Sequence, residues 1–82
     1  MFYDNTVWHY EVLGYNDPEG RGQEAAHEWP IARKADALRT GRTMSRTYKR
    51  VEVIAVETDA NDTNNLLGDK LVAAWVNGRK TA

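Results

Sequence analysis

The segment that most constrains the fold is residues 48–57, which read YKRVEVIAVE. Val51 and Val53 point to one side of an extended chain, whereas Ile54 and Val56 point to the other. Apolar side chains on both faces at the end of a strand are typical of a position inside a sheet. We therefore expect a central strand, around which the rest of the chain builds a sheet.

The first third of the chain supplies candidates for neighbouring strands. Residues 6–14, TVWHYEVLG, alternate aromatic or β-branched side chains and predict a strand, and the Asn-, Pro- and Gly-rich residues 15–22 predict a turn. Residues 23–29 leave two interpretations open. They form either a second strand that returns from the turn or the first turn of a helix. The strand is favoured because the residue before Pro30 is pushed toward extended geometry.

A helix is predicted over residues 30–44. Ile31, Ala35 and Leu38 recur at a spacing of three and four residues, with charged residues between them. Gly41 leaves the end of this helix open. The helix either stops there or continues to the end of the range at a cost of about 1 kcal/mol.

A second helix is predicted over residues 64–77, where apolar positions recur at helical spacing and an Asn-Gly pair suits a helix stop. Its expected apolar stripe consists of Leu67, Leu71, Ala74 and Trp75. The predicted order is β-β-α-β-α. The expected fold class is α+β, with one domain over residues 1–82 that contains a three-stranded antiparallel or mixed sheet and two helices.

Size and cysteine content narrow the class of function. A chain of 82 residues holds one small core, and a deep, water-free active site would consume much of it. We therefore expect a binding module rather than an enzyme, with no cofactor. The chain has no cysteine, which excludes disulfides and thiolate metal sites and favours a reducing compartment. No signal peptide or bilayer-length apolar run is present, so we expect a cytoplasmic protein without membrane contact.

Charge is distributed unevenly along the chain. Residues 33–50 contain seven bases and one acid, whereas the rest contains four bases and eleven acids. The net charge of −1 therefore conceals a strongly dipolar molecule, whose field can steer a charged partner.

The basic segment supplies the candidate site. If the predicted helix continues past Gly41, Arg39, Arg42 and Arg46 lie on one face. The bases either pair with acids of the same chain or bind a partner. We expect an acidic host protein as the partner. The alternative is that this chain is itself a small RNA- or DNA-binding protein that uses the same basic segment, but a pI of about 6.1 is low for a nucleic-acid binder. The predicted partner-binding residues are Arg39, Arg42, Arg46, Arg50, Tyr48 and Tyr15.

Other catalytic or metal-binding patterns are weak. A first hairpin symmetric about Pro18 would place His9 opposite His27, with Glu11 on the same face, but no local metal-binding spacing is present. Ser45 is the only serine and lies outside a G-x-S-x-G motif. We therefore predict no metal site and no catalytic residues.

Two stretches carry a resemblance to a known group of proteins. They read Trp29-Pro30-x-x-Arg33-Lys34-Ala35-x-Ala37-Leu38-Arg39-x-Gly41-Arg42 and Lys49-Arg50-Val51-Glu52-Val53. Together they resemble small α+β accessory proteins of actinobacterial phages and mobile elements, over about a third of the chain. The resemblance implies a short, non-enzymatic phage protein that binds or inhibits a host protein in the host cytosol. It implies no particular site residues.

Overall fold

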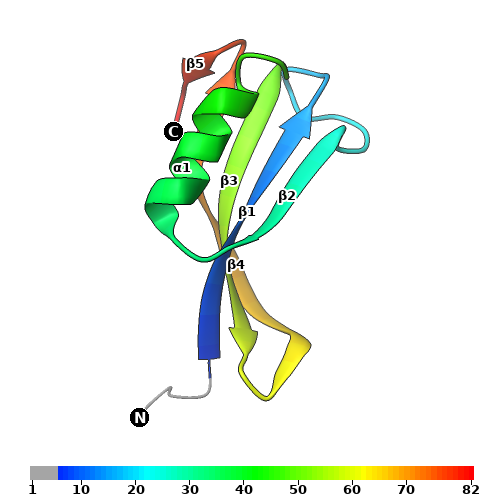
Figure 1. The fold of residues 1–82 in the computed structure, drawn as a ribbon. Coiled ribbons are helices and arrows are strands. Elements are labelled where there is room, and N and C mark those ends of the chain that lie inside the picture. The colour runs from blue at the N-terminus through cyan, green and yellow to red at the C-terminus, as the bar shows by residue number, and fades with distance from the viewer. Residues whose placement is uncertain (1–5) are drawn as a thin grey trace.

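The computed structural model describes residues 6–82, apart from the side chains of residues 6, 7, 63 and 64. One helix and five strands follow one another along the chain (Figure 1). The sheet is antiparallel, with the strand order β2-β1-β3-β4-β5. The elements are β1 (Thr6–Tyr15), β2 (Ala26–Ile31), α1 (Lys34–Met44), β3 (Arg50–Asp59), β4 (Asp62–Val76) and β5 (Arg79–Lys80).

The central strand predicted from residues 48–57 is confirmed as β3. It pairs with β1 along one edge and with β4 along the other. Val53 lies between Val12 of β1 and Ala73 of β4 in the register. Val51 and Val53 are fully buried, so the alternating pattern correctly located the middle of the sheet.

The predicted three-stranded sheet with two helices is wrong. A helix was expected over residues 64–77, but residues 64–76 belong to β4, a strand of 15 residues that pairs along β3. Helical spacing of the four stripe residues was coincidental, since Leu67 and Leu71 remain about half exposed. The free edge of β3 needs backbone partners, and this requirement overrides the helical preference of the segment.

The Asn77-Gly78 pair, expected to stop a helix, instead turns the chain between β4 and β5. Asn77 has φ 51° and Gly78 has φ 83°. Two successive residues with positive φ are the requirement of a type I′ hairpin turn, for which Asn-Gly is a preferred sequence. The hairpin brings β5 alongside the end of β4.

Of the two interpretations left open for residues 23–29, the strand is confirmed from Ala26 onward as β2, which pairs with β1, whereas residues 23–25 belong to the loop before it. Pro30 lies within β2, after a cis Trp29–Pro30 peptide bond. α1 therefore begins at Lys34 rather than at residue 30, and it continues through Gly41 to Met44.

The buried side of α1 differs from the predicted stripe. Ala35 is exposed, whereas Ala37 and Gly41 are buried and Leu38 is half-buried. Because Ile31 belongs to β2 and not to the helix, the spacing that starts from it does not identify the face that packs on the sheet.

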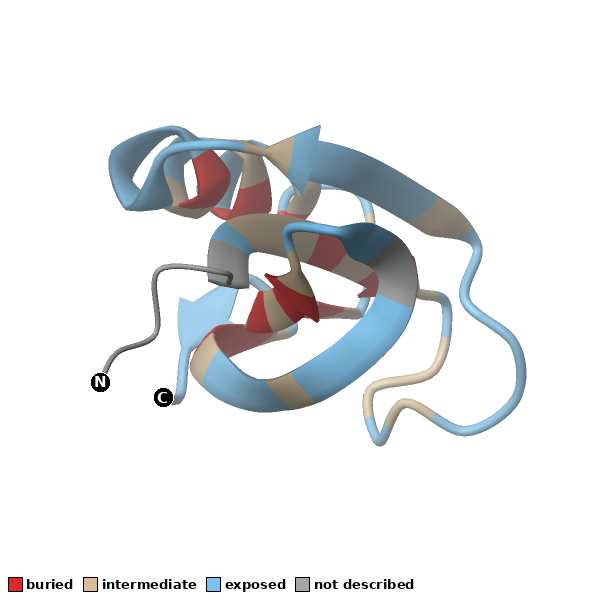
Figure 2. Cartoon of the chain, turned by 90° about the horizontal axis from the view of Figure 1, so that it is seen from below, coloured by how far each residue is buried: buried red, intermediate tan, exposed pale blue. Residues whose placement is uncertain are grey.

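α1 links two strands that are not neighbours. β2 and β3 are both antiparallel to β1, so they run parallel to each other, and α1 carries the chain across β1. The helix packs on one face of the sheet near one end, and the hairpin between β3 and β4 extends beyond it (Figure 1). We call this side the α1 face and the opposite side the open face. Figure 2 shows buried parts of α1 and the sheet facing each other.

A single glycine sets how closely α1 approaches the sheet. The core beneath the helix consists of Val12, Ala37, Val51, Val53, Ala73 and Trp75. A Cβ atom on Gly41 would lie 2.6 Å from Cζ3 of Trp75 and 2.9 Å from Cγ2 of Val53. Both distances are below van der Waals contact, so only a residue without a side chain allows this approach.

We predict that Gly41→Ala destabilises the protein although alanine is the better helix former. Helix propensity favours alanine by about 1 kcal/mol, whereas forcing a methyl group into a packed core costs about 1–3 kcal/mol. Urea denaturation should show a lower midpoint. Thr43→Ala, at an exposed position of α1, is the control and should leave stability equal or slightly higher. A Gly41→Ala variant at least as stable as the wild type would contradict the packing described here.

Candidate functional site

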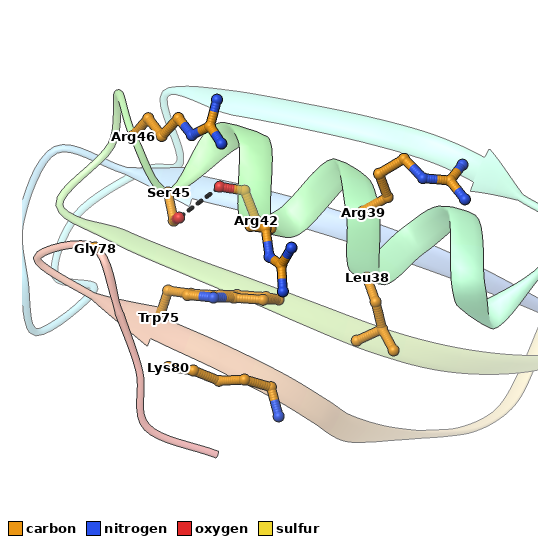
Figure 3. Close-up of a pocket in the computed structure, with 8 residues that line it drawn as sticks. All are labelled: Leu38, Arg39, Arg42, Ser45, Arg46, Trp75, Gly78 and Lys80. Carbon is orange, nitrogen blue, oxygen red and sulfur yellow. Dashed lines mark hydrogen bonds between the residues drawn. The ribbon is translucent and has the colours of Figure 1, made fainter.

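A groove of about 630 Å³ lies between α1 and the hairpin of β4 and β5 (Figure 3). We call it the cationic groove. Three arginines of the basic segment and one lysine of β5 line it. Its lining residues are Leu38, Arg39, Arg42, Ser45, Arg46, Trp75, Gly78 and Lys80.

The groove is built around the ring of Trp75. Figure 3 shows Arg42 pointing from α1 toward this ring and Lys80 lying on the other side of it. Arg39 extends from the side of α1 that is farther from the ring, and Arg46 extends from the turn that follows α1. The close approach of α1 at Gly41 and the hairpin turn at Gly78 thus bring cations from two distant segments to one site.

Ion pairs among the described residues involve only one of these four cations. Arg39 Nη1 lies 3.0 Å from Oδ1 of Asp36, but both side chains are largely exposed, and such pairs contribute little. Within the described part of the chain, neither Arg42, Arg46 nor Lys80 forms an ion pair. The groove therefore keeps a positive potential.

Ser45 does not resemble a nucleophile. Its side chain is buried, and its hydroxyl group donates a hydrogen bond to the carbonyl oxygen of Arg42 at 2.6 Å. Its backbone N–H donates to the carbonyl oxygen of Gly41. The residue thus satisfies backbone groups at the end of α1.

The remaining predicted site residues lie elsewhere. Arg50 is on the open face, where its Nε donates to Oε2 of Glu52 at 2.7 Å. Tyr15 pairs with Arg50 across β1 and β3. Burial raises the pKa of Tyr15, and the negative charge of Glu52 adds to the effect. The structure brings neither residue to the cationic groove.

Tyr48 is half-buried and lies outside the cationic groove. Its ring lies against Gly14, where a Cβ atom would be 2.9 Å from Cγ of the ring. Sequence reasoning also missed Lys80 and Trp75 as groove residues. The Asn-Gly turn signal could have found Lys80, because it implies a hairpin that returns alongside β4.

A second hollow lies on the α1 face, toward the N-terminal end of the helix. It has a volume of about 350 Å³, and we call it the aromatic recess. Trp8 and Tyr10 of β1 contribute aromatic rings, and one lysine comes from α1 and one from β4. The lining residues are Trp8, Tyr10, Lys34, Ala55, Lys70 and Val72.

The two histidines meet around one carboxylate on the open face. Nε2 of His27 donates to Oε1 of Glu11 at 2.7 Å, and Nε2 of His9 donates to Oε2 at 3.0 Å. The three residues lie on one face of the sheet, which agrees with the arrangement considered in the sequence analysis. The expected register differs, because His27 pairs with Leu13 and not with His9. Among the described residues, no group of three such side chains is arranged to hold a metal ion.

The histidines control the ionisation of Glu11. Burial alone would raise the pKa of its carboxyl group, but the hydrogen bonds and charges of His9 and His27 outweigh burial and lower that pKa. The cluster therefore ties β2 to β1 through an ionised carboxylate.

Comparisons with known proteins identify no relative: no family model, curated protein or solved structure gives a significant match. The described residues form no helix that is long and apolar enough to cross a membrane.

The Glu11 cluster generates a pH prediction. A carboxyl group whose pKa is lower in the folded than in the unfolded state stabilises the fold when the pH is above its unfolded-state pKa. This stabilisation disappears as the pH falls through the folded-state pKa. We expect Glu11→Gln to lower stability near neutral pH by about 1–2 kcal/mol, because it removes hydrogen bonds to a charged group. The difference should shrink steadily below about pH 4.5, the ordinary value for this group.

Urea denaturation of both proteins from pH 7 to pH 3 measures this difference. Glu24→Gln, at an exposed position of the loop between β1 and β2, serves as the control and should behave like the wild type. A constant difference between Glu11→Gln and the wild type over the whole range would show that the charge of Glu11 contributes nothing.

Proposed function

We propose that this protein is a non-enzymatic binding module whose cationic groove holds an acidic segment of another protein. One observation carries the proposal. Four cations line a single groove, and Arg42, Arg46 and Lys80 have no carboxylate partner within the described residues. Positive charge that is not neutralised within the fold remains available to a ligand.

The groove offers both charge and apolar contact. Guanidinium groups bind carboxylates through paired hydrogen bonds, and a complementary potential accelerates association. Leu38, which is half-buried, adds apolar surface between the charges, and the buried Trp75 forms the base of the groove, as at the centre of protein interfaces. An acidic segment with at least two carboxylates can therefore contact Arg42 and Lys80 together.

The distribution of charge favours a protein over a nucleic acid. Outside residues 33–50 the chain carries a net charge of −7, so a long polyanion that extended past the groove would meet repulsion. Among the described residues that line the groove there is no histidine or carboxylate. The groove therefore offers none of the usual groups for general acid–base catalysis, which supports a binding role. The sequence resemblance predicts that the partner is a protein of the cell that a phage infects, and this identity stays a prediction.

The proposal predicts that groove variants lose the partner. We expect the tagged chain to capture a protein from host lysate, and Arg42→Gln/Arg46→Gln to lose it. Arg21→Glu changes the net charge by the same amount in the loop between β1 and β2, away from the groove. This control should retain the partner. Captured proteins are quantified by mass spectrometry, with and without nuclease treatment.

The outcomes separate the alternatives. Capture that Arg42→Gln/Arg46→Gln retains in full would contradict the proposal, because the interface would lie elsewhere. Binding of random DNA or RNA at about 50 mM salt, with a log–log salt slope of about −3 to −4, would replace the acidic protein with a nucleic acid.

A further inference from the structure

The aromatic recess and the cationic groove lie along one side of α1. Lys34 lines the recess, whereas Leu38 and Arg42 line the groove, and these three residues follow one another at intervals of four positions. Residues at this spacing share a helix face. On the sheet, Val72 of β4 lines the recess and Trp75 of β4 lines the groove. α1 and β4 thus contribute residues to both hollows, and β1 and β3 complete the recess. We call the line along α1 that joins the two hollows the seam.

We infer that the acidic segment carries an aromatic residue that inserts into the aromatic recess. This inference rests on the proposed function of the groove and specifies its ligand. A peptide with an aromatic residue at one end would place that residue in the aromatic recess. Carboxylates along the rest of the peptide would contact the cationic groove. The helix has 11 residues and a length of about 16 Å, which corresponds to about five residues of extended peptide.

The walls of the recess favour an aromatic ring. Trp8 is 49% exposed, which is a large area of aromatic surface on an otherwise small molecule. Tyr10 provides a second ring, and Ala55, which is nearly fully buried, provides a small side chain between the lysines. Aromatic rings pair with an inserted ring in offset or edge-to-face arrangements, and each buries a large apolar area.

The charges of the recess favour an acidic neighbour for that ring. Lys34 and Lys70 line it from α1 and β4, and none of the described residues that line it is a carboxylate. Neither lysine forms an ion pair with a described residue. Two ammonium groups beside an open aromatic surface fit a ring that is followed by a carboxylate. A single-stranded nucleic acid offers related chemistry, with a base in place of the ring, and the test below includes it.

The test uses synthetic peptides and fluorescence anisotropy at low salt. The probes are fluorescein-labelled hexaglutamate, the same peptide with phenylalanine at its N-terminus, and the same peptide with phenylalanine at its C-terminus. Burial of the ring predicts about tenfold tighter binding of one of the two phenylalanine peptides than of hexaglutamate. Only one should gain, because the recess lies at one end of the seam.

Variants connect the gain to the recess. Trp8→Ala should abolish the advantage of the phenylalanine peptide and leave hexaglutamate binding unchanged, and Trp8→Phe should restore most of the advantage. Trp29→Ala removes another exposed tryptophan, which stacks on His27 on the open face. This control should change neither affinity. Thermal unfolding identifies any variant that fails to fold, and in that case Lys34→Gln/Lys70→Gln provides the second test of the recess.

The outcomes distinguish this inference from the function on which it rests. Equal affinity for all three peptides, with dependence on Arg42, overturns the anchor and leaves the proposed function intact. Absence of binding by every peptide counts against the proposed function itself. If oligo-dT of similar length to the peptides binds more tightly than any of them, and this binding depends on Trp8, the occupant is a single-stranded nucleic acid and not an acidic peptide.

Discussion

The contact between Gly41 and Trp75 is the constraint on which the rest of the structure depends. It seats α1 on the sheet at a distance that no side chain at residue 41 would allow. The same contact places Trp75 beneath the helix as the base of the cationic groove, with Arg42 beside it (Figure 3). The packing that stabilises this small core therefore also forms the candidate binding site.

The two faces of the sheet differ in how their charges are satisfied. On the open face, Glu11 accepts hydrogen bonds from two histidines, and Arg50 pairs with Glu52. On the α1 face, the cations that line the seam lack such partners within the described residues, except for Arg39. The dipolar charge pattern of the sequence thus becomes a difference between two surfaces, and the surface around α1 is the one that can attract an anion.

The sequence predicted the parts of the fold that depend on local patterns and missed those that depend on distant contacts. Alternation located β1 and the central strand β3 correctly. Helical spacing located α1, but it began the helix at residue 30 instead of Lys34 and left the C-terminal end open between Gly41 and Met44. Residues 64–77 were assigned to a helix because their leucines fit helical spacing, whereas the unpaired edge of β3 requires a strand there. Three arginines of the site were predicted from their spacing, although only Arg39 and Arg42 belong to α1 and Arg46 lies in the turn that follows the helix. Lys80 and Trp75 were missed because the helix wrongly predicted over residues 64–77 excluded the β4–β5 hairpin. Arg50 was grouped with the other arginines, but side chains alternate along β3 and Arg50 lies on the open face.

The most direct test of the account is an NMR titration of the ¹⁵N-labelled protein with hexaglutamate. The account predicts that amide shifts concentrate in residues 38–46, which span the end of α1 and the turn after it, and in the hairpin from Trp75 to Lys80. Little change is expected around Glu11 and Glu52. Shifts centred on the open face, or spread evenly over the surface, would contradict the claim that the seam along α1 forms the binding site.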